Sequence, residues 1–351
     1  MLQSLDMNSH TAQASPRFSI VVLNWNSLAL LRQCLDAIRA QSLRSFEVLI
    51  VDNGSSDGSR DWLAAADLGQ AVNAPARAIL LERNTGFAAG MNAGIRAAAG
   101  EWVTALNVDA FPAEDFLEQA AQAAARHPEA SALGARVCLY AGGRTETVNC
   151  SAVWLSRRMS VATLLGDPDA EAEVFGPAGC CPTYKRAALL ASQLEPAWTG
   201  GDAPQFYDEL YFAYGEDVDL YLRLQLLGQR CWYIPSMRVW HVHSATQAGV
   251  RWWEKDRATL GRLAANVFYT WLKNCPAGML LRFAPVALLA PLGMAAALLL
   301  RAPGKCLAPL RALSAIIAHL PRTLRIRRAL QRQRVQAAPK LLYYRHNAKQ
   351  E

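Results

Sequence analysis

Two stretches of this sequence carry acidic side chains whose type and spacing suit chemistry on a phosphate-bearing substrate. The first is Asn107-Val108-Asp109, which directly follows the apolar run 102–106. A buried strand has no structural use for an unpaired carboxylate at its end, because burying such a charge is costly. Asp109 is therefore either a turn or helix-cap residue or a ligand of a metal-bound diphosphate, and the motif alone leaves both interpretations open.

The second cluster is Glu216, Asp217 and Asp219, at the start of a helix predicted to run to residue 227. Acidic residues at a helix N-terminus stabilise the helix through its dipole, which is the structural interpretation. Three carboxylates together repel one another more strongly than a cap requires. This repulsion can raise the pKa of one of them towards the range of a general base, which is the functional interpretation.

Two histidines follow this cluster at alternating positions of a predicted strand. His241 and His243 share one face of the run 239–244, because successive side chains of a strand point to opposite faces. A single histidine would usually be structural. A pair that follows a carboxylate cluster and a strand is a candidate for metal binding.

These residues must be positioned by a sheet, and four apolar runs before residue 110 predict its strands. The runs lie at 18–23, 46–51, 78–81 and 102–106, and a helical pattern follows each of them. Ser27 is the predicted N-cap of the first helix. Strands that alternate with helices indicate an α/β fold with a Rossmann-like, mostly parallel sheet and flanking helices.

Polar residues follow each predicted strand at its carboxyl end. The four clusters lie at 24–27, 52–59, 82–86 and 107–109. The carboxyl ends of parallel strands meet at one edge of the sheet, where open α/β sheets bind their ligands. Any one cluster could be ordinary turn chemistry, but four at one edge, with Arg83 in one of them and aspartates in two, favour a site for nucleotide phosphates.

The second half of the chain has weaker patterns. Strands are predicted at 132–140 and 230–234, and Pro235 follows the second of them. The small-residue loop Gly176–Pro182 allows two interpretations, a tight turn beneath the sheet or a backbone-lined wall of an acceptor pocket.

Taken in order, these stretches resemble the family 2 glycosyltransferases, in particular their bacterial rhamnosyltransferase-like branch. The matching segments are Ile20–Asn26, Val51–Gly58, Arg83–Asn92, Leu106–Asp109, Tyr214–Leu220 and Pro235–His241, which together span residues 17–245. Each segment is unspecific alone, whereas the ordered set is specific. The resemblance implies a GT-A fold and an inverting glycosyl transfer.

The resemblance also implies which residues bind a nucleotide-sugar donor. They are Asn24, Asn26, Asp52, Asn53, Ser55, Arg83, Gly86, Asn92 and Asn107. Asp52, with Asn24 and Asn53 nearby, would hold the nucleoside, and Arg83 and Asn92 would line the phosphate side.

By the same resemblance, Asn107-x-Asp109 corresponds to the family's Asp-x-Asp metal motif, with a neutral residue in its first position. Asp109 and His241 are then the implied protein ligands of Mg²⁺ or Mn²⁺, and His243 is the histidine left over. The donor's own diphosphate would supply further ligands. Such a metal ion neutralises a diphosphate leaving group as the glycosidic bond breaks.

The resemblance assigns the acidic cluster to proton transfer. Asp217 matches the family's general base, which takes the proton of the attacking acceptor hydroxyl. Glu216 would orient the base or the acceptor, and Asp219 would contact the backbone or the sugar.

The C-terminal part of the chain differs in composition from the rest. Among 351 residues with a formal net charge of +7, basic residues dominate from Arg301 onwards. The run 283–300 has no charged residue, and a second apolar run at 307–320 is broken only by Arg311. Basic residues on both sides of each run favour a membrane-surface helical hairpin over a single span, and a buried helical pair is the alternative.

Three regions are expected from these patterns: a disordered tail over residues 1–16, a GT-A domain over 17–250, and a helical, basic, membrane-associating region over 251–351. The residues up to Ser15 lack the apolar segment of a signal peptide. The eight cysteines include no C-x-x-C pair, which disfavours structural zinc and favours reduced thiols in the cytoplasm. Nucleic acid is not an expected partner, because aromatic and basic residues do not interleave.

The expected activity is transfer of a sugar, rhamnose from dTDP-rhamnose, to a hydroxyl of a lipid-linked glycan at the inner face of the cell membrane. The product would be O-antigen or another surface polysaccharide. A nucleotidyltransferase is the first alternative, although the glycine-rich basic loop expected after its first strand is missing. A non-catalytic, membrane-bound scaffold that binds a sugar nucleotide is the second, and the acids at Asp109 and Asp217 argue against it.

Overall fold

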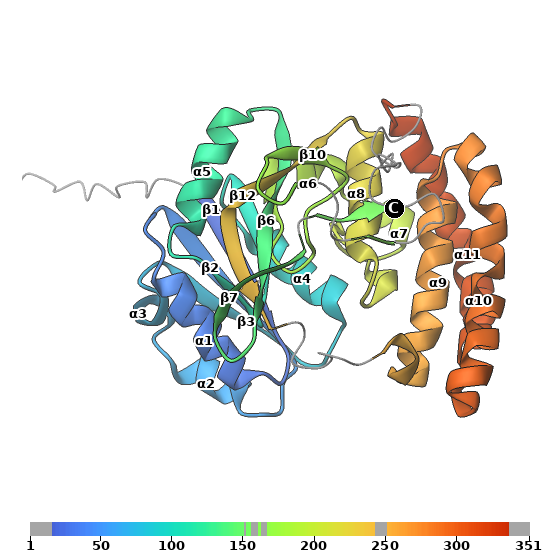
Figure 1. The fold of residues 1–351 in the computed structure, drawn as a ribbon, viewed down its shortest axis with the longest axis horizontal. Helices are drawn as coiled ribbons and strands as arrows, with labels where there is room; N and C mark the ends of the chain where they lie inside the picture. Colours follow the sequence, from blue (N-terminus) through green and yellow to red (C-terminus); the bar gives the residue numbers. More distant parts are fainter. Residues whose placement is uncertain (1–15, 151, 156–160, 163–166, 243–250, 337–351) are drawn as a thin grey trace, which may run out of the picture.

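A mixed β-sheet runs through the middle of the protein, with helices on both of its faces (Figure 1). The structure is a computed structural model that describes residues 16–150, 152–155, 161–162, 167–242 and 251–336. The strands of the main path follow the order β10-β12-β6-β11-β4-β1-β2-β3. The predicted disordered tail up to residue 15 and His243 lie outside the described residues.

The four predicted strands form the parallel half of this sheet. They are β1 (Phe18–Asn24), β2 (Phe46–Asn53), β3 (Ala76–Leu81) and β4 (Trp102–Asn107), and β1 pairs in parallel with both β2 and β4. The helices that follow them are α1 (Leu28–Arg39), α2 (Ser59–Ala65), α3 (Leu68–Val72), α4 (Phe87–Ala97) and α5 (Phe116–Arg126). The α/β prediction is confirmed.

The N-cap predicted for α1 is wrong in one respect. Ser27 occupies the cap position, but its side chain makes no capping hydrogen bond and donates to the carbonyl oxygen of Trp25 instead. The first-turn amide of Leu28 donates to Asp57 Oδ2 at 2.9 Å. The loop after β2 therefore caps the helix after β1, and this joins two of the polar clusters at the sheet edge.

The second half of the sheet is built from segments far apart in the chain. The strand β11 (Thr183–Lys185) lies antiparallel between β4 and β6 (Ala130–Tyr140). The strand β12 (Arg230–His241) is parallel to β6 and antiparallel to the short β5 (Ala110–Pro112). The remaining strands are β7 (Arg144–Cys150), β8 (Trp154–Leu155), β9 (Val161–Ala162) and β10 (Ala172–Val174).

The predicted strand 230–234 does not end at Pro235. It continues as one strand to His241, with a register shift between Ile234 and Arg238. Proline has no amide hydrogen for the ladder, so it is accommodated at such an irregularity. One strand therefore runs from beside α5 to the edge of the sheet where the polar clusters gather.

Each face of the sheet has its own hydrophobic core. Along β1, Ile20 and Val22 join the core beneath α1 and α5, whereas Val21 joins the core beneath α4 and α8. Central strands buried on both faces are apolar throughout, which is why these runs were recognisable. The second face is completed by α6 (Arg186–Ser192), α7 (Pro196–Thr199), the short η1 (Glu209–Tyr211) and α8 (Glu216–Leu226).

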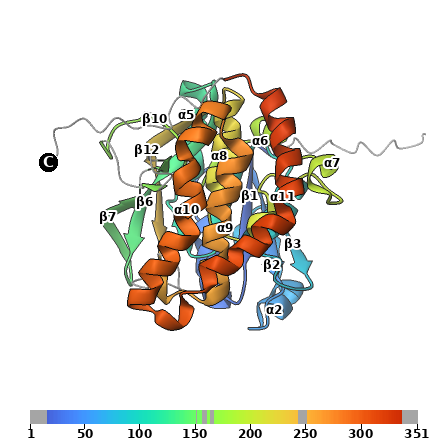
Figure 2. The ribbon, with the colours of Figure 1, turned by 90° about the vertical axis from the view of Figure 1, so that its right-hand side faces the viewer.

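Three long helices form a layer on one side of the molecule (Figure 2). After the short η2 (Trp252–Glu254) come α9 (Arg257–Asn274), α10 (Ala277–Arg301), η3 (Pro303–Lys305) and α11 (Ala308–Gln333). Ala264 and Phe268 of α9 lie in the same core as Val21 of β1. The helical region is therefore packed against the domain that contains the sheet, through α9.

The helix α10 is mostly exposed. It is long and apolar enough to cross a membrane, with a mean hydropathy of 2.2 in its best window, of which only 22% is buried. Leu281 and Leu300 are 78% and 83% exposed. α10 and α11 are joined through η3 and contact each other, so they form a helical hairpin. α11 packs against α9, and a membrane-surface position of the hairpin stays a prediction.

Candidate active site

A cavity of about 760 Å³ opens at the carboxyl ends of the parallel strands. It contains six of the predicted site residues: Asn53, Gly86, Asn107, Asp109, Glu216 and Asp217. The segment 212–217 forms its second wall, and the first turns of α9 form the third. Residues separated by more than 150 positions in the chain thus face one space.

Asp109 and His241 lie side by side at the edge of this cavity. Asp109 Oδ1 and His241 Nε2 are 3.1 Å apart, and Asp109 is only 8% exposed. The pairing of β5 with β12 sets this distance, because it places His241 opposite Ala110. The two residues that the sequence implied as metal ligands are brought together across 132 positions.

The atoms around this pair suit a hard divalent cation in part. Asn107 Oδ1 is buried and has no hydrogen-bond partner among the described residues. With one carboxylate and one imidazole nitrogen, this amide oxygen makes a donor set of the kind that Mg²⁺ and Mn²⁺ accept. No group of three or more His, Cys, Asp or Glu side chains gathers as a metal site in the described part of the chain. Ligands from a substrate would have to complete the coordination.

Glu216 and Asp217 reach the cavity from the first turn of α8. The chain enters this helix through Tyr214 and Gly215, both with positive φ, at 74° and 89°. Such a conformation is strained for tyrosine and is typical of functional sites. Burial raises the pKa of both carboxyls, and for Glu216 the neighbouring charge of Asp217 raises it further. Both acids are thereby shifted towards the range of a general base.

The loop Gly176–Pro182 is resolved in favour of the wall interpretation. Gly179 lines the cavity, and a Cβ atom there would lie 2.7 Å from Asp217 Oδ2. Gly176 lies against the ring of Tyr221, where a side chain would not fit. The loop is fixed to β4, because the Asn107 amide donates to the Cys180 carbonyl at 2.9 Å. Glycine at 179 therefore leaves room for the carboxylate beside it.

Asp219 does not share the cavity, and the expectation that it contacts the backbone or the sugar is wrong. It is fully buried beneath α8 and pairs with Arg223 at 3.1 Å and with Lys273 at 2.8 Å. Asn274 Nδ2 also donates to it at 2.7 Å. The carboxylate two positions from the proposed base thus has a structural partner on each side.

The polar residues after β1 and β2 join the two loops. Asn24 Nδ2 donates to Asp52 Oδ1 at 3.1 Å, and the Ser55 amide donates to Asp52 Oδ2 at 3.0 Å. Asn26 Oδ1 accepts the Ser56 amide at 2.7 Å. Asn24 Oδ1 is left without a partner among the described residues. Asn24, Asn26, Asp52 and Ser55 do not line the cavity themselves, and Asn24 and Asp52 are fully buried. They join the two loops beside it, and Trp25 lines the cavity with 49% of its surface exposed.

The predicted residues Asn53, at the end of β2, and Arg83 and Gly86, after β3, do not all line the cavity. Asn53 lines the cavity and donates to the Gly86 carbonyl at 3.0 Å, while its oxygen accepts the Thr85 amide at 2.9 Å. Arg83 is exposed and does not line the cavity. It touches this region through its backbone, against which Gly54 packs.

Asn92 has a different task from the one expected. It is fully buried, away from the cavity, and its Nδ2 donates to the Tyr207 carbonyl at 2.7 Å. Its Oδ1 accepts the amides of Phe206 and Tyr207. An amide whose donors and acceptor are engaged in this way holds the segment 205–209 in place, so the expectation that it lines the phosphate side is not met.

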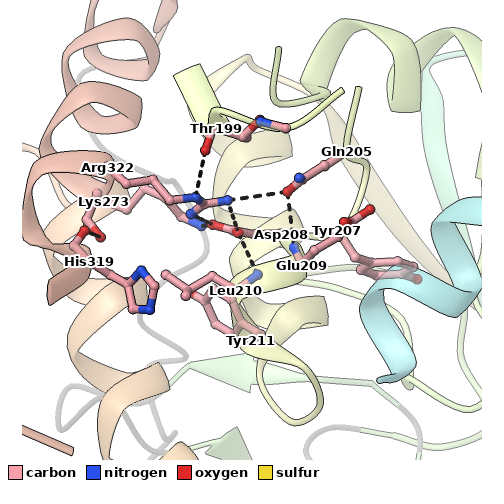
Figure 3. A network of polar contacts seen from close by, with 12 residues as sticks. Thr199, Gln205, Tyr207, Asp208, Glu209, Leu210, Tyr211, Lys273, His319 and Arg322 are labelled. Carbon is pink, nitrogen blue, oxygen red and sulfur yellow. Dashed lines mark hydrogen bonds and ion pairs between the residues drawn. The ribbon is translucent and has the colours of Figure 1, made fainter. Parts of the chain in front are cut away.

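A buried network around Asp208 was not anticipated (Figure 3). Asp208 is ion-paired with Lys273 of α9 and, at 2.7 Å, with Arg322 of α11. Burial alone would raise its pKa, but these two charges hold the pKa of Asp208 well below its usual range. A stripe of polar residues in the helical pattern of α9 indicates such a face: Asn266, Thr270, Lys273 and Asn274.

The helix α9 also contributes to the cavity itself, which the sequence did not indicate. Asp256, Thr259 and Arg262 line it. Arg262 lies over the ring of Phe212, 4.5 Å from its centroid. Asn266 donates to the carbonyls of Tyr211, Ala213 and Tyr214, and so fixes the segment that leads into α8.

Comparisons with known proteins agree with this geometry. Residues 19–190 match the family model described as Glycosyl transferase family 2. An N-acetylglucosaminyl-diphospho-decaprenol L-rhamnosyltransferase of Mycobacterium tuberculosis is 28% identical over 252 residues, which are 66% of this chain and 77% of that protein. A PGL/p-HBAD biosynthesis glycosyltransferase of Mycobacterium bovis is 35% identical over 100 residues, or 27% of this chain and 36% of that protein.

Among solved structures, GalNAc-T7 with UDP, GalNAc and Mn²⁺ has a TM-score of 0.56 at 14% identity. The similarity covers 74% of this chain and 51% of that one, and at this identity it concerns the fold. The chain thus spans about half of that structure, and the match to the Mycobacterium bovis relative covers 36% of that protein's length.

Proposed function

This chain belongs to glycosyltransferase family 2, with the GT-A fold, and we propose that it is an inverting, metal-assisted enzyme that transfers a sugar from a nucleotide to a lipid-linked glycan. One observation carries this proposal. Two carboxylates with raised pKa, Glu216 and Asp217, line the same cavity as Asn107 and Asp109, and His241 lies 3.1 Å from Asp109. A base and a diphosphate-binding group in one cavity are what a glycosyl transfer requires.

Asp217 acts as the general base in this proposal. It takes the proton of the acceptor hydroxyl while the hydroxyl oxygen attacks the anomeric carbon from the face opposite the nucleotide. A new glycosidic bond forms as the bond to the diphosphate breaks, so the configuration inverts. Glu216 keeps a partner-free oxygen, Oε2, within the described residues and orients the acceptor or the base.

Asn107, Asp109 and His241 would hold Mg²⁺ or Mn²⁺ in this proposal. When bound, the ion supplies positive charge to the leaving diphosphate. The structural relative that contains Mn²⁺ supports this choice of metal. The residues themselves fix the place of the diphosphate, because β4, β5 and β12 hold them rigidly at one edge of the sheet.

The nucleotide would lie over the loops after β1 and β2. Trp25 offers an exposed ring for a base to stack on, and the hydrogen bond between Asn24 and Asp52 joins the two loops beside it. Rhamnose from dTDP-rhamnose is the proposed donor, and a lipid-linked glycan of a surface polysaccharide such as O-antigen is the proposed acceptor. The N-acetylglucosaminyl-diphospho-decaprenol L-rhamnosyltransferase of Mycobacterium tuberculosis supports rhamnose as the sugar and a lipid-linked, diphosphate-bearing glycan as the acceptor.

The exposed leucines of α10 and α11 would contact the inner face of the cytoplasmic membrane. Leu288, Leu292 and Ile317 are more than half exposed, and basic residues flank the hairpin. The full chain should float with vesicles that contain anionic lipid, and Leu288→Glu with Leu292→Glu should reduce flotation. Equal flotation of both proteins would rule out this surface.

The activity is tested with the full chain, Mn²⁺ and a panel of nucleotide sugars with a short polyprenyl-diphosphate glycan. We expect release of dTDP from dTDP-rhamnose that depends on acceptor and metal, together with a product of inverted configuration. Release of pyrophosphate would identify a nucleotidyltransferase. Tight donor binding without turnover for any acceptor would identify a scaffold, and either result would overturn the proposal.

A further inference from the structure

A second cavity, of about 450 Å³, lies between α9 and α11 and plays no part in the site described so far. Its charged lining is basic: Arg257 and Arg262 come from α9, and Arg311 and His319 come from α11. The rest of its wall is largely small residues, which leave the guanidinium groups accessible. None of the residues that line it is acidic.

The two helices bring their N-terminal ends to this cavity. Arg257 Nη2 donates to the Gly304 carbonyl near the start of α11, and Arg327 of α11 donates to the Leu272 carbonyl near the end of α9, at 2.8 and 2.7 Å. The helices therefore run in the same direction. Gly261 permits their close approach, because a Cβ atom there would lie 3.2 Å from the Ala308 carbonyl.

Parallel helices add their dipoles at the shared end. The N-terminal amides and the positive end of the macrodipole attract anions. Leu307, at the N-cap position of α11, provides no side-chain hydrogen bond to its first turn. The carboxylate of Asp256 caps α9, so the helix end that adds positive potential to the basic lining is that of α11.

The arginines of this cavity differ from other arginines in the helical layer. Arg322, eleven residues after Arg311, is ion-paired with Asp208. In the described part of the chain, Arg257, Arg262 and Arg311 form no ion pair within 4 Å of a carboxylate. Asp256, which lies near enough to Arg262 for its pKa to be affected, is engaged with Thr259. Arg257 donates to the Gly304 carbonyl and Arg262 lies over Phe212. The N–H groups that these contacts leave, together with those of Arg311, can bind a ligand.

Arg262 connects this cavity with the active site. It lines both cavities, and its guanidinium lies against Phe212 in the segment that separates them. Leu210 faces the basic cavity, whereas Phe212 to Asp217 face the larger one. A ligand anchored by the basic cavity can therefore extend past Arg262 towards Asp217.

We propose that this basic cavity binds the diphosphate group of the acceptor, so that the acceptor sugar attached to it enters the active site beside Arg262. The inference rests on the proposed function, since it assigns the acceptor of that reaction a place. Guanidinium groups bind diphosphate oxygens with paired, charge-assisted hydrogen bonds.

The first test measures binding of inorganic pyrophosphate and of a short prenyl diphosphate to the full chain by calorimetry. The double variant Arg257→Gln, Arg311→Gln is compared with Arg325→Gln, an exposed arginine of α11 outside the cavity. We expect the double variant to bind the prenyl diphosphate roughly tenfold to hundredfold more weakly, and Arg325→Gln to bind it as the unchanged chain does. Equal loss in both variants, or none, would overturn the proposal.

The second test separates a lipid-linked acceptor from a free anion. In the transfer assay, the double variant should raise the KM for the diphosphate-linked acceptor and leave the KM for the donor unchanged. Binding of pyrophosphate without binding of prenyl diphosphate would overturn the acceptor assignment. Unchanged transfer in the double variant would overturn this inference and leave the proposed function standing, whereas absence of transfer in the unchanged chain would overturn the function itself.

Discussion

The helix α8 separates two groups of carboxylates that have the same chemistry and opposite surroundings. On the cavity side, Glu216 and Asp217 are buried next to each other, and neither forms an ion pair with any residue that the structure describes. On the opposite side, Asp219 and Asp208 are buried with Lys273, Arg223 and Arg322 around them. The comparison shows that burial alone does not decide what a carboxylate does. The presence or absence of a positive partner decides it.

The two groups affect stability in opposite directions as the pH changes. The pKa of Asp208 is lowered, so its ionised form stabilises the fold above the ordinary carboxyl range, near 4, and that contribution is lost as the pH falls below it. The pKa values of Glu216 and Asp217 are raised, so the folded state is penalised as the pH rises from that range through the raised values. Lowering the pH therefore removes the stabilisation that Asp208 provides and removes the penalty for burying the charges of Glu216 and Asp217.

Asp217→Asn removes the base and keeps the shape of the cavity side. We expect the rate of transfer to fall by roughly 10³-fold, which is about 4 kcal/mol in the activation barrier. The reason is that no base remains to take the proton of the attacking hydroxyl. Steady-state rates of sugar transfer measure this, with Asp202→Asn, an exposed aspartate, as the matched control. Intact transfer in Asp217→Asn would show that Asp217 is not the base and that the carboxylates on the cavity side of α8 have no catalytic role.

Lys273→Met removes the cation that Asp208 and Asp219 share. It leaves two buried carboxylates short of a cation, which should lower the free energy of unfolding by about 3 kcal/mol. Urea denaturation measures this change. The double variant Lys273→Met, Asp208→Asn is the control, and it should be less destabilised than the sum of its single changes, since it removes a charge that the first change leaves unpaired. Simple additivity would contradict the assignment.

The pH dependence of kcat/KM distinguishes the two groups most finely. The acidic limb should lie above the ordinary carboxyl range, because the raised pKa of the Glu216–Asp217 pair governs deprotonation of the base. Glu216→Gln should move this limb to lower pH by removing a neighbouring negative charge. Glu114→Gln, at an exposed glutamate, should leave it in place. A limb that does not move with Glu216 would show that the pair does not titrate together.

The sequence was most informative where local pattern and position coincide. Four apolar runs became the four parallel strands. Three of them, β1, β2 and β4, are largely buried, and strands covered on both faces are apolar almost throughout. Asp109 and His241 were implied as partners from motifs 132 positions apart, and the structure places them at 3.1 Å. The edge of a parallel sheet collects the loops of successive strands, so motifs at strand ends are predictable neighbours.

The sequence was least informative where a side chain acts across elements. Asn92 is of a residue type that often binds ligands, but its side chain accepts the amides of Phe206 and Tyr207, which lie more than a hundred positions away in the chain. Asp57 caps a helix that begins almost thirty residues earlier, which no local pattern encodes. Asp208 and Lys273 lie in different regions of the chain, and only their packing reveals that they neutralise each other.

The pairing of β12 with β5 has a consequence for recombining this chain with its relatives. The family match ends at residue 190, yet Asp217, which lines the cavity, and His241, which contacts Asp109, lie beyond it. A chimera spliced at that boundary would combine a donor-binding half from one parent with a base and a histidine from another. A chimera should instead be joined between residues 242 and 257, after β12 and before α9. The helical layer it receives must contain a lysine at position 273, which pairs with Asp208.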